Sequence, residues 1–84
     1  MKFRKKPVVI EAVRWTGKNW EEIKAMDPEH RRLGLERQHL YVSTLEGILT
    51  ACIGDWIIKG VRGELYPCKP EIFAATYEPV EGSI

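Results

Sequence analysis

Basic and aromatic side chains lie close together in the second half of the chain. The residues are Trp56, Lys59, Arg62, Tyr66 and Lys69. Cations beside aromatic rings suit an anion, such as a phosphate, a nucleotide or an acidic patch of a protein. Glycines at positions 60 and 63 predict a tight turn with Arg62 at its tip. The alternative is structural: the aromatic rings fill the core of a small domain, and the cations are only solvated.

Arg14 and Trp15 form a second group with the same chemistry. Arg14 falls on the more apolar face of a predicted strand, so its guanidinium needs a partner. Either it pairs with a carboxylate, for which Glu11, Asp55 and Glu64 are candidates, or it lines a ligand pocket. Arg14 and Trp15 therefore complete the set of candidate ligand-binding residues.

The sequence contains residues that could serve as a nucleophile and a base, but no motif brings them together. Cys52 or Cys68 could be combined with His30 or His39. Cys52 lies in an apolar stretch that predicts a buried, inert thiol, whereas Cys68 lies between two prolines and next to Lys69. A catalytic thiol needs a lowered pKa. We predict no catalytic residues, and an enzyme with Cys68 as its nucleophile is the minor alternative.

Metal and cofactor motifs are not found in the sequence. The two cysteines are isolated, and the histidines, at positions 30 and 39, are too far apart for a zinc-binding pair. The glycines of the segment from 60 to 63 are too few and too close for a phosphate-binding loop or a dinucleotide fingerprint. We therefore expect no metal and no cofactor.

The balance of charges excludes a protein that coats DNA. The 84 residues contain thirteen Lys and Arg and twelve Asp and Glu, a net charge of +1. The charge is uneven, with a net +4 over residues 1–37 (ten basic, six acidic) and −3 over residues 38–84 (three basic, six acidic). The basic excess comes from Lys2, Arg4, Lys5 and Lys6, which either contact nucleic acid or protect and solvate the edge of a sheet.

The compartment is predicted from the cysteines and from the N-terminal residues. Two cysteines in so small a chain are more typical of reduced thiols in the cytoplasm than of a secreted disulfide framework, although a single bond between Cys52 and Cys68 is the alternative. The apolar stretch after the basic N-terminus ends at Glu11, too early for a signal peptide, and no stretch is long enough to span a membrane. We expect a cytoplasmic protein.

The first half of the chain predicts one strand, one short helix and a loop. Residues 8–15 are rich in β-branched and aromatic residues, with Val8, Ile10, Ala12 and Arg14 on the likelier core face. The other face is also largely apolar, so the strand could be covered on both sides. Asn19 predicts the N-cap of a two-turn helix, and a polar loop follows over residues 27–38.

The second half predicts β structure. Residues 39–44 and 48–53 form one hairpin, residues 56–59 and 64–66 form a second, residues 70–75 form a helical turn, and residues 76–78 form an edge strand. Residues 81–84 are expected to be a frayed tail. The fold class is α+β, in one domain spanning residues 1–84. It should consist of a small curled, mainly antiparallel sheet of five or six strands, a half-barrel, with one or two short helices.

Two stretches carry a resemblance to a known group of proteins. They are residues 54–60 (GDWIIKG), continued by 63–73 (GELYPCKPEIF) and 75–80 (ATYEPV), and the opening residues 5–12 (KKPVVIEA) with Trp15. The chain resembles a family of short, uncharacterised proteins of tailed bacteriophages and prophages over residues 1–16 and 47–80. The resemblance implies a phage or prophage protein in a bacterial cell, and it implies no catalytic residues.

These observations lead to one functional prediction and one alternative. We predict an accessory, non-catalytic binding module for a host or phage protein, or for a small anionic ligand, that acts through the C-terminal hairpin. The alternative is a nucleic-acid-binding protein that uses the basic N-terminus and stacks bases on Trp15 or Trp56. Three tryptophans and a strand that is apolar on both faces also predict a homodimer.

Overall fold

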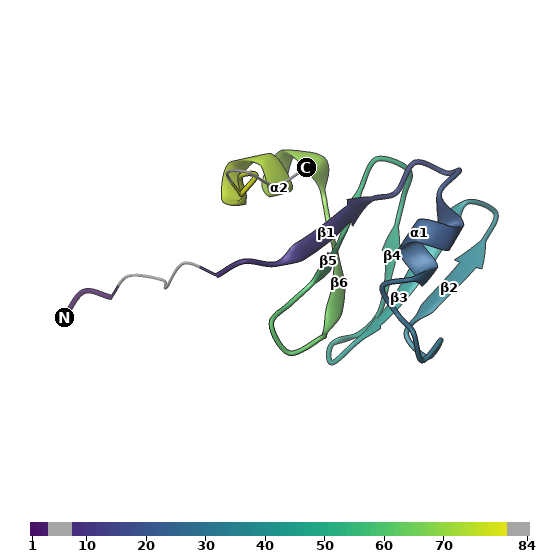
Figure 1. Cartoon of the computed structure of the whole chain (residues 1–84), viewed down its shortest axis with the longest axis horizontal. Coiled ribbons are helices and arrows are strands. Elements are labelled where there is room, and N and C mark those ends of the chain that lie inside the picture. The colour runs from purple at the N-terminus through teal and green to yellow at the C-terminus, as the bar shows by residue number, and fades with distance from the viewer. Residues whose placement is uncertain (4–7, 81–84) are drawn as a thin grey trace.

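A computed structural model describes residues 1–3 and 8–80 of the chain (Figure 1). The expected tail, residues 81–84, and the basic residues Arg4, Lys5 and Lys6 lie outside the described residues. The elements in chain order are β1 (Glu11–Arg14), α1 (Trp20–Lys24), β2 (Leu33–Glu36), β3 (His39–Thr44), β4 (Gly47–Ala51), β5 (Trp56–Lys59), β6 (Leu65–Cys68) and α2 (Pro70–Thr76).

The six strands of the described residues form two antiparallel three-stranded sheets. One sheet has the order β1-β5-β6 and the other the order β2-β3-β4, and β6 packs against β3 and β4. The class is α+β with antiparallel sheets, as predicted. The expected single curled sheet, a half-barrel, is wrong in detail, because the strands divide into two sheets.

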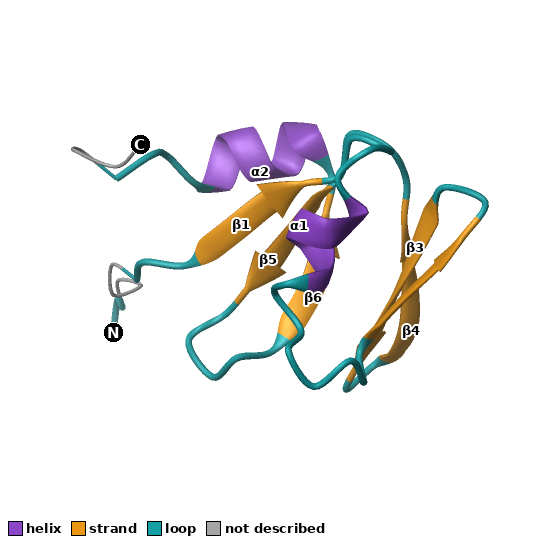
Figure 2. Cartoon of the chain, turned by 45° about the vertical axis from the view of Figure 1, so that its right-hand side comes forward, coloured by secondary structure: helices purple, strands orange, loops and turns teal. Residues whose placement is uncertain are grey.

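The main core lies between the two sheets and α1, which covers one side of the space between them (Figures 1 and 2). It contains Trp15, Ile23, Met26, Leu40, Val42, Ala51, Ile57 and Leu65. Val13 packs against this core, so the core-facing side of β1 is that of Val13 and not, as predicted, that of Ala12 and Arg14. The expectation failed because both faces of this strand carry apolar residues, so the alternation of side chains does not show which face points toward the core.

The second face of the β1-β5-β6 sheet is covered by α2 (Figure 2). Ile58 is fully buried and yet lies outside the main core, because side chains alternate along β5 and Ile58 shares its face with Trp56. The Trp56 ring stacks on Phe73 of α2. β5 is therefore covered on both sides, whereas Glu11 and Arg14 of β1 remain exposed.

Two segments differ from their predicted structures. Residues 33–36 form a strand inside the expected loop, because the buried Asp27 carboxylate accepts hydrogen bonds from the backbone N–H groups of Arg32 (2.8 Å) and Leu33 (3.2 Å) and so orients the chain toward β3. Residues 76–78 do not form the expected edge strand. Helix α2 continues to Thr76, and Tyr77 remains next to Phe73, one helical turn away.

The short helix α1 begins after Asn19, as predicted. The Asn19 side chain does not cap the helix but connects the residues around it. Its amide oxygen accepts a hydrogen bond from the Thr16 N–H (2.9 Å). Its amide nitrogen donates to the Glu22 carboxylate (2.8 Å) and to the Arg14 carbonyl (2.7 Å). This last bond fixes the end of β1 against the start of α1. No helix among the described residues is long and apolar enough to cross a membrane.

Candidate functional site

The structure separates the seven residues that the sequence grouped as a ligand site. Trp15 is 1% exposed, and its indole N–H donates to the Gln38 carbonyl at 2.8 Å. It is a core residue and can neither line a pocket nor stack on a base. The remaining six residues lie on the β1-β5-β6 sheet or beside it, at different ends and on different faces.

One end of this sheet carries Arg14 and Lys69, and both cations already have partners. Arg14 lies opposite Trp56 in the strand pair, and its Nε donates to the Gly54 carbonyl at 3.2 Å and not to any of the predicted carboxylates. The Lys69 Nζ lies 2.7 Å from Asp55, whose side chain is buried. The hydrogen bond to Asp55 raises the pKa of Lys69. Lys69 therefore serves mainly to balance the charge of Asp55.

The other end of the sheet carries Lys59 and the exposed Arg62 of the β5–β6 hairpin. A third cation, which the sequence did not reveal, lies beside them: the Arg32 guanidinium donates to the Gly63 carbonyl at 2.6 Å. The carboxylate of Glu64 lies in the same turn and accepts from the Arg62 N–H at 3.4 Å. The cations at this end therefore form an open, partly neutralised surface.

Tyr66 belongs to the face under α2. Its hydroxyl oxygen lies 3.3 Å from that of Tyr77, and the two share a hydrogen bond. Burial, together with this hydrogen bond, raises the pKa of Tyr66 to about 12. Tyr66 thus fastens α2 to the sheet, and its hydroxyl is not a base or an acid near neutral pH.

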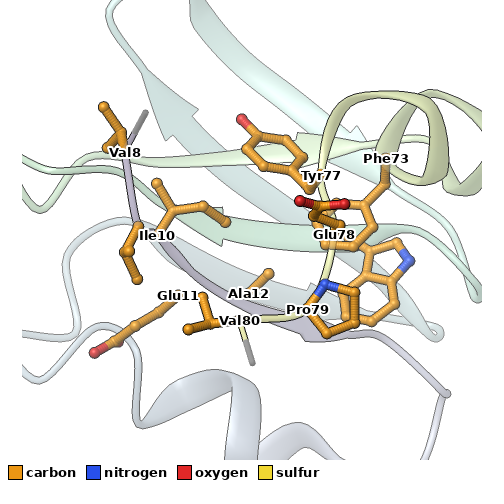
Figure 3. Close-up of a pocket in the computed structure, with 11 residues that line it drawn as sticks. Val8, Ile10, Glu11, Ala12, Phe73, Tyr77, Glu78, Pro79 and Val80 are labelled. Carbon is orange, nitrogen blue, oxygen red and sulfur yellow. The ribbon is translucent and has the colours of Figure 1, made fainter. Parts of the chain in front are cut away.

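A cavity on the described surface lies between the segment that enters β1 and the segment that leaves α2 (Figure 3). Its volume is about 740 Å³. The residues that line it are Val8, Val9, Ile10, Glu11, Ala12, Trp56, Phe73, Tyr77, Glu78, Pro79 and Val80. We call this cavity the groove. Most of its lining is apolar, and its charged residues are two carboxylates.

An aromatic ladder forms one wall of the groove. The Trp56 and Phe73 rings are stacked with centroids 4.1 Å apart and an angle of 7° between planes, and Tyr77 follows Phe73 at 5.2 Å. Figure 3 shows Val8, Ile10 and Ala12 across from these rings. Of the predicted site residues, only Trp56 lines the groove. The spacing of Phe73 and Tyr77, four residues apart, was the available signal, but it requires a helix where a strand was predicted.

The edge of β1 next to the groove faces away from β5. Trp15 directs both its N–H and its C=O toward the β5 side, where they bond Asp55 (2.8 Å) and Gly54 (2.7 Å). Because these directions alternate along an antiparallel strand, the peptide groups of Ala12 and Arg14 point outward. The Arg14 carbonyl is already bound by Asn19, whereas no hydrogen bond within the described residues occupies the outward groups of Ala12.

The two thiols are free, and their surroundings differ from the prediction. Cys52 is exposed and not buried, because β4 ends at Ala51 and Cys52 begins the turn to Asp55. Burial, and then the negative charges of Asp55 and Glu71, raise the pKa of Cys68. A nucleophile requires the opposite shift, so the environment of Cys68 does not favour the minor enzymatic alternative.

This difference predicts the order in which the thiols are alkylated. At pH 8 we expect iodoacetamide to modify Cys52 several-fold faster than Cys68, because a raised pKa and partial burial lower the amount of accessible thiolate at Cys68. Rates measured by mass spectrometry on Cys52→Ser and Cys68→Ser test this, with unfolded protein in urea as the control in which both rates become similar. Faster modification of folded Cys68 would contradict the expected order.

Comparison with models of protein families, with curated proteins and with solved structures finds no match for this chain.

Proposed function

We propose that this protein is a non-catalytic binding module that receives an extended segment of a protein partner in the groove. The observation that carries the proposal is the groove itself: an apolar cavity with an aromatic wall, open beside a strand whose outward peptide groups can pair with an added strand. Strand addition next to pockets for alternate side chains is a common mode of peptide recognition. The resemblance to phage and prophage proteins supports an accessory role of this kind in a bacterial cell.

The chemistry of the groove favours one kind of segment. Its apolar lining accommodates aliphatic side chains at alternate positions of an extended chain. Glu78 places negative charge on its lining, whereas the Glu11 side chain alternates to the opposite face of β1 from Ala12. A basic residue that flanks the segment is therefore favoured and an acidic one is repelled. We therefore propose a partner segment with alternate Val, Ile or Leu residues and a neighbouring Lys or Arg.

A small anionic ligand is less well supported as the partner. Among the described residues, the charged side chains that line the groove are carboxylates. Lys69 is paired with Asp55, and Lys59 and Arg62 lie at the other end of the sheet in an exposed hairpin. The nucleic-acid alternative also loses one of its two stacking residues, since Trp15 is buried.

Titration calorimetry with two synthetic peptides tests the proposal. Both are capped eight-residue peptides with valine at alternate positions, one flanked by lysines and the other by glutamates. We expect the lysine peptide to bind at least ten-fold more tightly, because it alone complements Glu78. Val80→Asp, at the half-exposed end of the groove, should abolish this binding.

Val61→Asp is the matched control, because Val61 is also an exposed valine (71%, against 50% for Val80) but lies on the β5–β6 hairpin. It should leave the affinity of the lysine peptide unchanged. The proposal fails if neither peptide binds, if Val61→Asp weakens binding as much as Val80→Asp does, or if a nucleotide binds and the lysine peptide does not.

A further inference from the structure

The chain itself contains a segment of the kind that the groove is proposed to receive. Residues 8–12 (VVIEA) carry aliphatic side chains at alternate positions and are preceded in the sequence by Lys5 and Lys6. Val8 is 49% exposed and Val9 74% exposed. We infer that the groove is filled by a second copy of this chain: residues 8–12 of the two copies pair as antiparallel strands about a twofold axis at Ile10. This inference rests on the proposed function of the groove.

The directions of the peptide groups allow this pair. Ala12 directs its N–H and C=O away from β5. β1 begins at Glu11, so in the proposed pair residues 8–10 extend this strand, and the same alternation then directs the peptide groups of Ile10 and Val8 toward the second copy. Two antiparallel strands exchange hydrogen bonds only between residues whose peptide groups face each other. In a symmetric pair, Ile10 therefore bonds Ile10 of the other copy, and Val8 lies opposite Ala12.

Two neighbouring registers are disfavoured, one by an observed contact and one by charge. A twofold axis at Ala12 would require Arg14 to pair, but the Arg14 carbonyl is held by Asn19 at 2.7 Å and the loop before α1 occupies that position. An axis at Glu11 would place two carboxylates directly opposite each other, which destabilises a strand pair. An axis at Ile10 avoids both problems and places Glu11 opposite Val9.

The side chains also fit this arrangement. Val8, Ile10 and Ala12 lie on the side of the strand that faces the aromatic ladder (Figure 3). In the pair, the same three residues of the second copy continue this apolar surface at its open edge. The β1 edges are then covered, and the β1-β5-β6 sheets of the two copies join into one sheet of six strands. An exposed strand edge can pair with other chains and cause aggregation, and proteins commonly prevent this by covering the edge.

Formation of this dimer also affects the binding of any other partner. A different protein that carries an extended aliphatic segment must displace the second copy before it enters the groove. Recognition of that partner would then depend on protein concentration, because the dimer and the partner compete for the same strand edge.

Cross-linking tests the register directly. Ile10→Cys is placed in a background of Cys52→Ser and Cys68→Ser, and the protein is oxidised with oxidised glutathione. Opposite residues of a hydrogen-bonded pair have Cα atoms about 5.5 Å apart, a separation that a disulfide spans. We expect Ile10→Cys to form a covalent dimer, and Val61→Cys, exposed on the distant hairpin, to form at least ten-fold less.

Sedimentation of the unmodified chain provides the second measurement and does not depend on how Ile10→Cys folds. We expect a reversible dimer that Val80→Asp weakens at least ten-fold and Val61→Asp leaves unchanged. A chain that remains monomeric but binds the lysine peptide would overturn the second copy as occupant and leave the proposed function standing. A monomer that binds neither peptide would overturn both, and a dimer that Val80→Asp does not weaken would overturn the inference alone.

Discussion

Replacing Trp15 with alanine is expected to unfold the protein or to leave it barely folded. Trp15 is 1% exposed in the core between the two sheets and α1, and its indole N–H holds the Gln38 carbonyl. Removing a buried tryptophan costs about 3–5 kcal/mol, a large share of the roughly 5–15 kcal/mol that stabilises a natural domain. Thermal unfolding followed by circular dichroism should show the cooperative transition lost, or its midpoint lowered by 10 °C or more.

Trp56→Ala is the matched control, since it removes the same side chain from the groove. The Trp56 ring is only half-buried, and beyond its buried area its stacking on Phe73 contributes about 0.5–1.5 kcal/mol. We expect a folded protein with a modestly lowered midpoint that no longer binds the lysine peptide. Equal loss of stability in the two variants would contradict the assignment of Trp15 to the core and Trp56 to the groove.

Strands were predictable where the sequence carries both alternation and boundaries. The ranges predicted for β3 and β5 match the observed His39–Thr44 and Trp56–Lys59, because turn residues flank clear β-forming stretches. β2 was missed because its Leu33-Gly34-Leu35 core is too short to signal a strand. Its conformation depends on pairing with β3 and on the buried Asp27, and neither contact is visible from local sequence.

The site was less predictable than the fold, for two physical reasons. Nearness in sequence is not nearness on a strand: Trp56 and Lys59 are three residues apart, which places them roughly 10 Å apart and on opposite faces of β5. The groove, in turn, combines residues 8–12 with residues 73–80, which meet only because α2 folds back over the sheet. The sequence could therefore identify the residue types of a binding surface but not the set of residues that forms one.

The turn between β4 and β5 depends on the buried carboxylate of Asp55. This carboxylate accepts the Cys52 N–H at 2.9 Å and the Lys69 ammonium at 2.7 Å, and the backbone of Gly54 and Asp55 bonds Trp15. We expect Asp55→Ala to lower the free energy of unfolding by about 2–3 kcal/mol, because it removes the charged acceptor of the part-buried hydrogen bond from the Cys52 N–H. Urea denaturation at pH 7 measures this loss.

Lys69→Met separates the two bonds that Asp55 makes. The Lys69 side chain is half-exposed, so its charge is screened by water and its loss should change the free energy of unfolding much less than the loss of Asp55. A large loss with Lys69→Met and a small one with Asp55→Ala would contradict this order and make the ion pair, not the turn, the source of stability. The expected order instead leaves the fold in place without Lys69.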